Sequence, residues 1–190
     1  MSLNTIDFLL LGRNGSGKSA TGNSILRKKH FFRRSNSIQE MTRPTYESCE
    51  RQDARVTVVD GLNIREAAEK ADYVDVTEAL EQSGGFSALL IVLKFGDRFS
   101  EEDWKVVESA KLVLGEEVWR RFGIVVLTGG DNFKREAEEG DQQLRNMDDW
   151  VGQQKGKIRD MYEECGRRIV LFDNTTRDIE EQQAQVNKLI

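Results

Sequence analysis

The chain has 190 residues, of which 38% are hydrophobic and 32% are charged. That length fits one ordinary domain and is sufficient to bury a core without disulfides or structural metals. The formal net charge of −5 at pH 7 argues against nucleic acid as a partner, because phosphate binding needs concentrated Lys and Arg.

Short apolar runs separated by charged, helix-like stretches recur along the chain. They are typical of buried parallel strands and lie at 8–11, 56–59, 88–93, 124–127 and 169–172. This alternation predicts an α/β fold: a doubly wound, mostly parallel sheet with helices on both faces and right-handed crossovers. We expect the segment 45–49 to pair antiparallel with 56–59, because only a short connection separates them. A single domain is expected to span 1–190.

The first apolar run leads into GRNGSGKS, from Gly12 to Ser19. This is the Walker A pattern, in its required place between a strand and a helix-forming stretch. Its glycines let backbone amides surround phosphate oxygens, and the following helix begins with unpaired N–H groups and the positive end of its dipole. We expect Lys18 to reach the β and γ phosphates of a nucleotide, and the Ser19 hydroxyl to coordinate Mg²⁺. The nucleotide-binding residues predicted in this P-loop are Asn14, Gly15, Ser16, Gly17, Lys18, Ser19 and Ala20.

Helical segments are expected between the later strands. Ser100 followed by Glu101, Glu102 and Asp103 is typical of a helix N-cap with an acidic first turn, and Gly115 marks the expected end of that helix. The charged stretches 142–165 and 178–190 are predicted to form surface helices that cover the sheet.

The fourth apolar run leads into TGGD, from Thr128 to Asp131, where a G domain places its guanine-reading loop. We expect the Asp131 carboxylate to accept hydrogen bonds from N1 and N2 of guanine. Adenine has no matching pair of donors on that edge, so guanine would be selected. Thr128 and Asp131 are therefore predicted on the base side of the site. An ATP-binding P-loop protein with Asp131 as an incidental loop residue stays open.

Two stretches resemble the GIMAP family, the GTPases of immunity-associated proteins. They read GRNGSGKSATGNSIL at 12–26 and ALLIVLKFGDRFSEEDWKVVESAKLVLGEEVWRRFGIVVLTGGDNF at 88–133. The second is similar to that family's own conserved box, and the resemblance runs from about Asp7 to Ile190. It implies a P-loop NTPase G domain related to septin and chloroplast-import GTPases, with Mg²⁺ and GTP or GDP as ligands. It also implies a homodimer or homo-oligomer across the nucleotide face, and Asn174 beside the base.

The switch regions depart from the family's pattern. Where the family reads Asp-Thr-Pro-Gly, Asp60 is followed directly by Gly61-Leu62-Asn63, so either two residues are missing or Asn63 replaces the glycine. The resemblance still assigns Asp60 to Mg²⁺ and Gly61 to the nucleotide, but the shortened loop predicts a blunted response to the γ-phosphate. Thr42 resembles the family's switch threonine, which closes over Mg²⁺ and the γ-phosphate, and Thr45 is its rival.

Hydrolysis has one candidate catalytic residue. No glutamine follows the third motif at a position suited to orient water, so intrinsic hydrolysis is expected to be slow. Arg98 resembles the basic residue that precedes the aromatic of the family's box, although Asp97 is inserted beside it. Reaching across a dimer, its guanidinium would stabilise charge on the phosphates; a helix-entry arginine paired with Glu101 or Glu102 is the alternative.

The sequence thus predicts a protein that binds GTP or GDP with Mg²⁺, assembles in a nucleotide-dependent way, and hydrolyses GTP slowly or weakly. An active GTPase that uses an arginine in trans stays open, and an ATP-binding protein is the less favoured alternative. The predicted metal ligands are Ser19, Thr42 and Asp60. No signal peptide or membrane span is recognisable, so we expect a cytoplasmic location, with membrane association left to a C-terminal extension outside this chain.

Overall fold

A six-stranded sheet forms the centre of the computed structural model, which describes residues 4–28, 45–51, 54–60, 85–139 and 146–190. The strand order is β2-β3-β1-β4-β5-β6, and all neighbours are parallel except β2, which is antiparallel to β3. The apolar runs and the antiparallel pair expected from the sequence are confirmed. The strands are β1 (Asn4–Leu11), β2 (Thr45–Arg51), β3 (Ala54–Asp60), β4 (Ala88–Lys94), β5 (Gly123–Thr128) and β6 (Ile169–Phe172).

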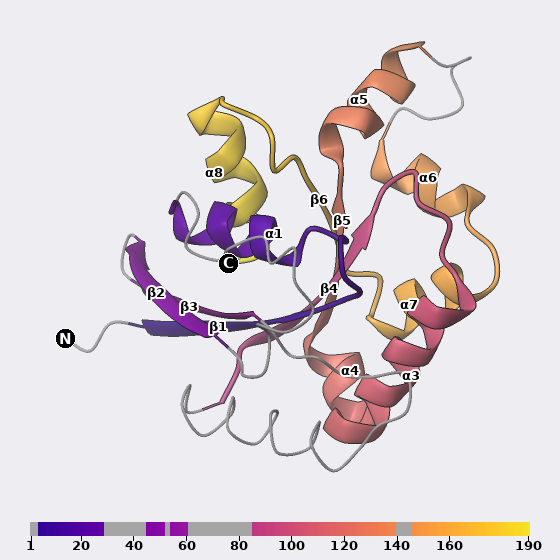
Figure 1. Ribbon diagram of the computed structural model, residues 1–190, viewed down its shortest axis with the longest axis horizontal. Coiled ribbons are helices and arrows are strands. Elements are labelled where there is room, and N and C mark those ends of the chain that lie inside the picture. Colours follow the sequence, from indigo (N-terminus) through magenta and orange to yellow (C-terminus); the bar gives the residue numbers. More distant parts are fainter. Residues whose placement is uncertain (1–3, 29–44, 52–53, 61–84, 140–145) are drawn as a thin grey trace.

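Helices cover both faces of the sheet, as the sequence predicts (Figure 1). One face carries α1 and α8, and the other carries α3, α4 and α7. None of the described helices is long and apolar enough to cross a membrane. The described helices are α1 (Lys18–Leu26), α3 (Glu101–Leu114), α4 (Glu116–Phe122), α5 (Gly130–Glu139), α6 (Met147–Gln153), α7 (Lys157–Glu164) and α8 (Ile179–Asn187).

Burial on both faces explains why the strands are continuous apolar runs rather than alternating ones. In β1, Phe8 and Leu10 pack in the cluster that includes α1 and α8, whereas Leu9 and Leu11 pack in the cluster that includes α3, α4 and α7. Successive residues of a strand point to opposite faces of the sheet. Because helices cover both faces, all four side chains are buried.

The helix signals around α3 are also confirmed. The Ser100 hydroxyl accepts from the backbone N–H of Asp103, and the Asp103 carboxylate accepts from the backbone N–H of Ser100 at 2.8 Å. This reciprocal pair is a capping box that satisfies two backbone donors at the helix start. Gly115 ends the helix with a φ of 92°, a conformation that favours glycine.

The candidate site residues gather because of this topology. The carboxyl ends of β1, β3, β4, β5 and β6 lead into the P-loop, Asp60, the loop before α3, the TGGD segment and Asn174 respectively. Parallel strands bring these ends to one edge of the sheet, which is where ligands bind in open α/β folds.

Candidate functional site

The P-loop lies tightly against neighbouring strands. Gly12 has a φ of +148°, and a Cβ at that position would lie 2.4 Å from the carbonyl oxygen of Val92. A Cβ on Gly17, whose φ is +102°, would lie 3.0 Å from the side chain of Thr128. Both positions therefore require glycine for the backbone to pass, a packing reason that adds to the phosphate-binding reason inferred from the motif.

Lys18 folds back over this loop. Its Nζ donates hydrogen bonds to the carbonyl oxygens of Gly12 at 2.7 Å and Arg13 at 3.0 Å. Burial lowers the pKa of Lys18, and the nearby Asp60 carboxylate opposes that effect. A largely buried ammonium at the start of α1, beside the unpaired N–H groups of a helix N-terminus, favours the binding of an anion.

Two of the three predicted metal ligands are in contact. The Ser19 hydroxyl donates to Oδ2 of Asp60 at 2.6 Å, which joins the first turn of α1 to the end of β3. A hydroxyl and a carboxylate are hard oxygen donors of the kind that Mg²⁺ prefers, so the residues present fit this ion. Among the described residues no group of three His, Cys, Asp or Glu side chains could hold a metal.

The switch candidates are less defined. Thr42 and Gly61 lie outside the described residues, so their assignments stay predictions. Thr45, the rival to Thr42, is the exposed first residue of β2 and lies opposite Asp60 in the antiparallel register. This register places the backbone of Thr45 close to the predicted magnesium site.

Thr128 ties the base-side loop to the phosphate-side loop. Its buried hydroxyl lies 2.7 Å from the carbonyl oxygen of Ser16 and 3.1 Å from that of Leu93. The next residue, Gly129, has a φ of +81°, which turns the chain into α5. Asp131 follows as an exposed residue in the first turn of that helix. The sequence placed Thr128 near the nucleotide, but did not foresee that it links two loops.

Asn174 is held by α1. Its Nδ2 donates to the Thr21 hydroxyl at 3.1 Å, and its Oδ1 accepts from the Ser24 hydroxyl at 2.8 Å. Its position after β6 puts it at the edge that also carries the P-loop and Asp131. Its predicted contact with the base stays a prediction.

Arg13 joins the P-loop to the segment that begins α3, a link that sequence reasoning missed. One guanidinium nitrogen lies 2.6 Å from Asp97, and Nε lies 3.0 Å from the buried carboxylate of Asp103. Arg13 occupies a variable position of the Walker A pattern, and Asp97 looks like an insertion, so neither position signals the pair. The pairing holds the β4–α3 loop beside the phosphate-binding loop.

Arg98 follows Asp97 in this loop and is exposed. It lines a cavity of about 350 Å³ together with Arg13, Phe95 and Trp150. Of the two partners expected under the helix-entry alternative, Glu101 pairs with Lys157 at 2.5 Å, and the side chain of Glu102 lies outside the described part of the chain. Among the described side chains no ion pair to Arg98 is found. Its guanidinium group is exposed at the edge of the P-loop.

Comparison with known sequences identifies the family. The sequence profile of the AIG1 family matches residues 6–190. The chain belongs to the AIG1 family. Among its curated relatives in Arabidopsis thaliana, immune-associated nucleotide-binding protein 8 is 29% identical over 97% of this chain and 51% of the relative's length. Immune-associated nucleotide-binding protein 9 is 30% identical over 96% of this chain and 52% of its own length. The chain thus spans about half the length of these relatives.

Solved structures support the fold of this AIG1-family chain. Toc33 from Arabidopsis thaliana, in complex with GDP and Mg²⁺, superposes with a TM-score of 0.62 at 19% identity, covering 98% of this chain and 83% of that chain. The G domain of the FeoB iron transporter from T. maritima gives a TM-score of 0.54 at 14% identity, covering 98% and 99% respectively. The expected G-domain fold of the P-loop NTPase class is therefore confirmed.

Proposed function

We propose that this AIG1-family domain binds GTP and GDP with Mg²⁺ through the edge formed by the P-loop, Asp60 and the TGGD segment. The observation that carries the proposal is the contact between Ser19 and Asp60 beside the buried ammonium of Lys18. A nucleotide phosphate chain with a bound divalent ion matches these three residues. The ion would bind the oxygens of Ser19 and Asp60, and the negatively charged phosphate would pair with Lys18.

The chain's own residues divide the work of binding. Lys18 and the N-terminus of α1 attract phosphate oxygens, while Ser19 and Asp60 would hold Mg²⁺. The ion, when bound, neutralises phosphate charge. Asp131, at the exposed start of α5, would accept hydrogen bonds from guanine, and Thr128 links that loop to the P-loop. The relatives' description as nucleotide-binding proteins and the GDP complex of Toc33 support this proposal.

In this proposal, GTP hydrolysis depends on the assembly of two molecules of the protein. Arg98 is exposed on the loop that Arg13 anchors to the P-loop, where it can be presented to a second molecule. A guanidinium supplied in trans stabilises charge on phosphates and is worth roughly a thousandfold or more in G proteins that use one. Dimerization is important for the GTPase activity of the chloroplast translocon components atToc33 and psToc159, which supports a dimer here.

The test is direct. The purified protein is denatured and the nucleotide it releases is identified by chromatography, after which the refilled protein is assayed for GTP turnover. Recovery of GDP or GTP supports guanine binding, and a slow rate supports a nucleotide-regulated binding protein. Release of adenine nucleotides alone would favour the ATP-binding alternative and contradict the role given to Asp131.

A further inference from the structure

The loop after β6 is a tight turn built around Asp173. One carboxylate oxygen, Oδ1, accepts from the backbone N–H of Thr175 at 2.9 Å, its hydroxyl at 2.7 Å and the backbone N–H of Thr176 at 2.9 Å. The backbone N–H and carbonyl of Asp173 bond to the side-chain amide of Gln185 in α8. These bonds fix the direction of the second oxygen, Oδ2, because the carboxylate cannot rotate without losing them.

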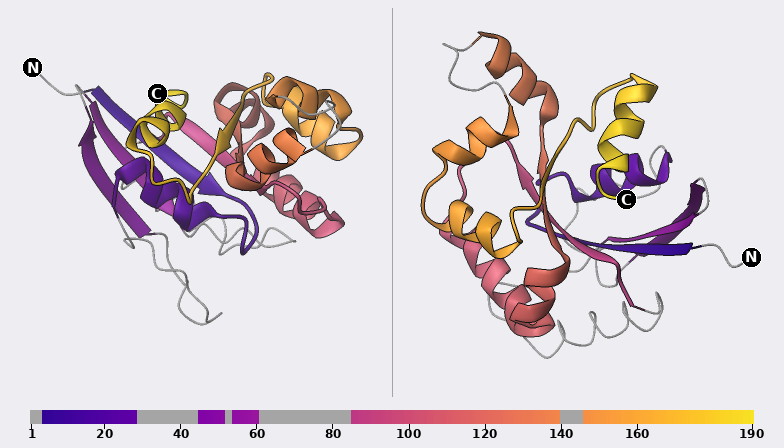
Figure 2. Two further views of the ribbon diagram at one scale, coloured as in Figure 1. Left: turned by 90° about the horizontal axis from the view of Figure 1, so that it is seen from above. Right: turned by 180° about the vertical axis from the view of Figure 1, so that it is seen from behind.

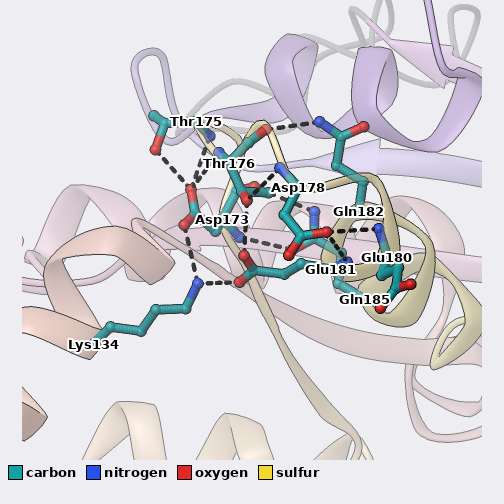
Figure 3. Close-up of polar contacts among 9 residues, drawn as sticks. All are labelled: Lys134, Asp173, Thr175, Thr176, Asp178, Glu180, Glu181, Gln182 and Gln185. Carbon is teal, nitrogen blue, oxygen red and sulfur yellow. Dashed lines mark hydrogen bonds and ion pairs between the residues drawn. The ribbon is translucent and has the colours of Figure 1, made fainter.

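Oδ2 of Asp173 is the partner of a lysine from another element (Figure 3). Lys134 of α5 places its Nζ 3.3 Å from that oxygen and also bonds to Glu181 of α8. Glu181 accepts in addition from the hydroxyl of Thr176 at 2.7 Å. We call Lys134, Asp173 and Glu181 the base-loop brace, because they join α5, the β6–α8 loop and α8.

A second contact fixes the same two segments at closer range. A Cβ on Gly130 would lie 3.0 Å from the backbone nitrogen of Asp173 and 3.1 Å from its Cα. The first turn of α5 therefore rests directly on the backbone of the β6–α8 loop. A methyl group at Gly130 would push the two apart by a few tenths of an ångström.

The brace matters because, among the described residues, the buried contacts of α5 are confined to its first turns. The helix extends away from the sheet in Figure 1 and in the right-hand view of Figure 2, and its buried residues are Gly130 and Phe133. Phe133 stacks edge-to-face on Phe95 with ring centroids 5.1 Å apart, which holds one side of the first turns. Lys134 is the next residue, about 100° further around the helix and one turn after Asp131, so its contacts hold α5 from a second direction and limit rotation of the helix about its axis.

We infer that Lys134 and Asp173 are positioning residues for base selection: the brace sets the distance and angle between Asp131 and the loop that carries Asn174. The inference rests on the proposed function, in which Asp131 reads guanine. It goes further by assigning guanine discrimination to an ion pair in which neither partner belongs to the predicted base-reading residues. A carboxylate that must meet two donors at once tolerates little misplacement. If α5 were held less firmly, the protein would lose its selectivity for guanine before it lost its affinity for the phosphates.

The experiment compares GDP with inosine diphosphate, which lacks the 2-amino group, by calorimetric titration in excess Mg²⁺. The wild type should prefer GDP by about tenfold or more, because one hydrogen bond to a charged acceptor is lost with inosine. Lys134→Met should reduce that ratio by about threefold or more, while Lys134→Arg, which can pair with both carboxylates, should keep it. Gly130→Ala should reduce the ratio as well, because it separates the same segments without removing a charge.

Lys157→Met is the matched control, since it breaks a lysine–glutamate pair between α7 and α3. It should leave the ratio at the wild-type value. Unchanged ratios in both Lys134→Met and Gly130→Ala would overturn the inference, even if melting temperatures fall, because a purely structural role lowers stability without touching discrimination. A wild type that fails to prefer GDP over ADP would instead overturn the proposed function, and the inference with it.

Discussion

At the scale of single residues, Thr128 shows how a side chain next to the site acts through the backbone. Its hydroxyl lies between the carbonyl oxygens of Ser16 and Leu93, and the side chain is buried. This explains why the P-loop and the TGGD segment keep a fixed spacing although they are more than a hundred residues apart.

We predict that Thr128→Val destabilises the fold by about 1–3 kcal/mol, because a buried carbonyl loses its donor while the side-chain volume is retained. Thr128→Ser keeps the hydroxyl and should cost less. Urea unfolding of the three proteins measures the difference. If valine and serine variants were equally stable, the hydroxyl would have no part in joining the loops.

At the scale of elements, α3 depends on one carboxylate for two tasks. Asp103 completes the capping box with Ser100, and its carboxylate also forms an ion pair with Arg13. We predict that Asp103→Ala lowers the free energy of unfolding by about 1–2 kcal/mol, the usual range for loss of an N-terminal cap. Arg13→Ala removes the ion pairs to Asp103 and Asp97 but leaves the capping box intact, and should cost less. Denaturant titration distinguishes the two tasks, and equal losses would mean that capping contributes little.

The base-loop brace also predicts a pH dependence. Burial raises the pKa of Asp173, but hydrogen bonds from Thr175 and Lys134 outweigh it and hold the pKa below 3.8. Burial lowers the pKa of Lys134, but the bonds to Glu181 and Asp173 outweigh it and hold the pKa above 10.5. The Asp173 contribution is therefore present above pH 3.8 and lost as pH falls through its lowered pKa. The Lys134 contribution is present below pH 10.5 and lost as pH rises through its raised pKa.

It follows that the destabilisation caused by Lys134→Met should stay constant between about pH 5 and 9 and shrink toward both extremes. Urea unfolding of the wild type and the variant, within this pH range and on both sides of it, measures the destabilisation. A difference that titrated near neutral pH would show that groups other than Lys134 and Asp173 govern the contact.

The elements themselves were predictable, whereas their cross-links were not. Apolar runs and the cap at Ser100 predicted the strands and the start of α3, because each signal is local in the sequence. Walker A predicted that Lys18 and Ser19 lie together for the same reason. The Arg13–Asp103 pair and the Lys134–Asp173 pair join residues far apart in the chain, so their existence depends on tertiary packing that no local pattern records. Gly130 belongs to the TGGD segment predicted to read guanine, and the structure adds a steric reason for a glycine at this position.

At the scale of the whole molecule, the exposed edge of the P-loop is the place where a second copy would act. Arg98 lies there on a loop held by Arg13, and no ion pair neutralises it among the described side chains. We predict that turnover per molecule rises with protein concentration and that Arg98→Ala abolishes the rise, with a loss of roughly a thousandfold in the assembled state. Light scattering reports assembly in the same samples. A rate independent of concentration and unchanged in the variant would remove Arg98 from the mechanism.

In the proposed function, the P-loop and the carboxylate of Asp131 make this domain specific for guanine nucleotides. The most direct measurement is calorimetric titration of the wild type and Asp131→Asn with GDP, ADP and xanthosine diphosphate in excess Mg²⁺. We predict that the wild type binds GDP far more tightly than ADP, and that the variant prefers xanthosine diphosphate. Xanthine carries an oxygen in place of the 2-amino group of guanine, and the side-chain NH₂ of asparagine can donate to that oxygen. Equal affinity of the wild type for GDP and ADP, or a variant whose preference among the three is unchanged, would contradict the account.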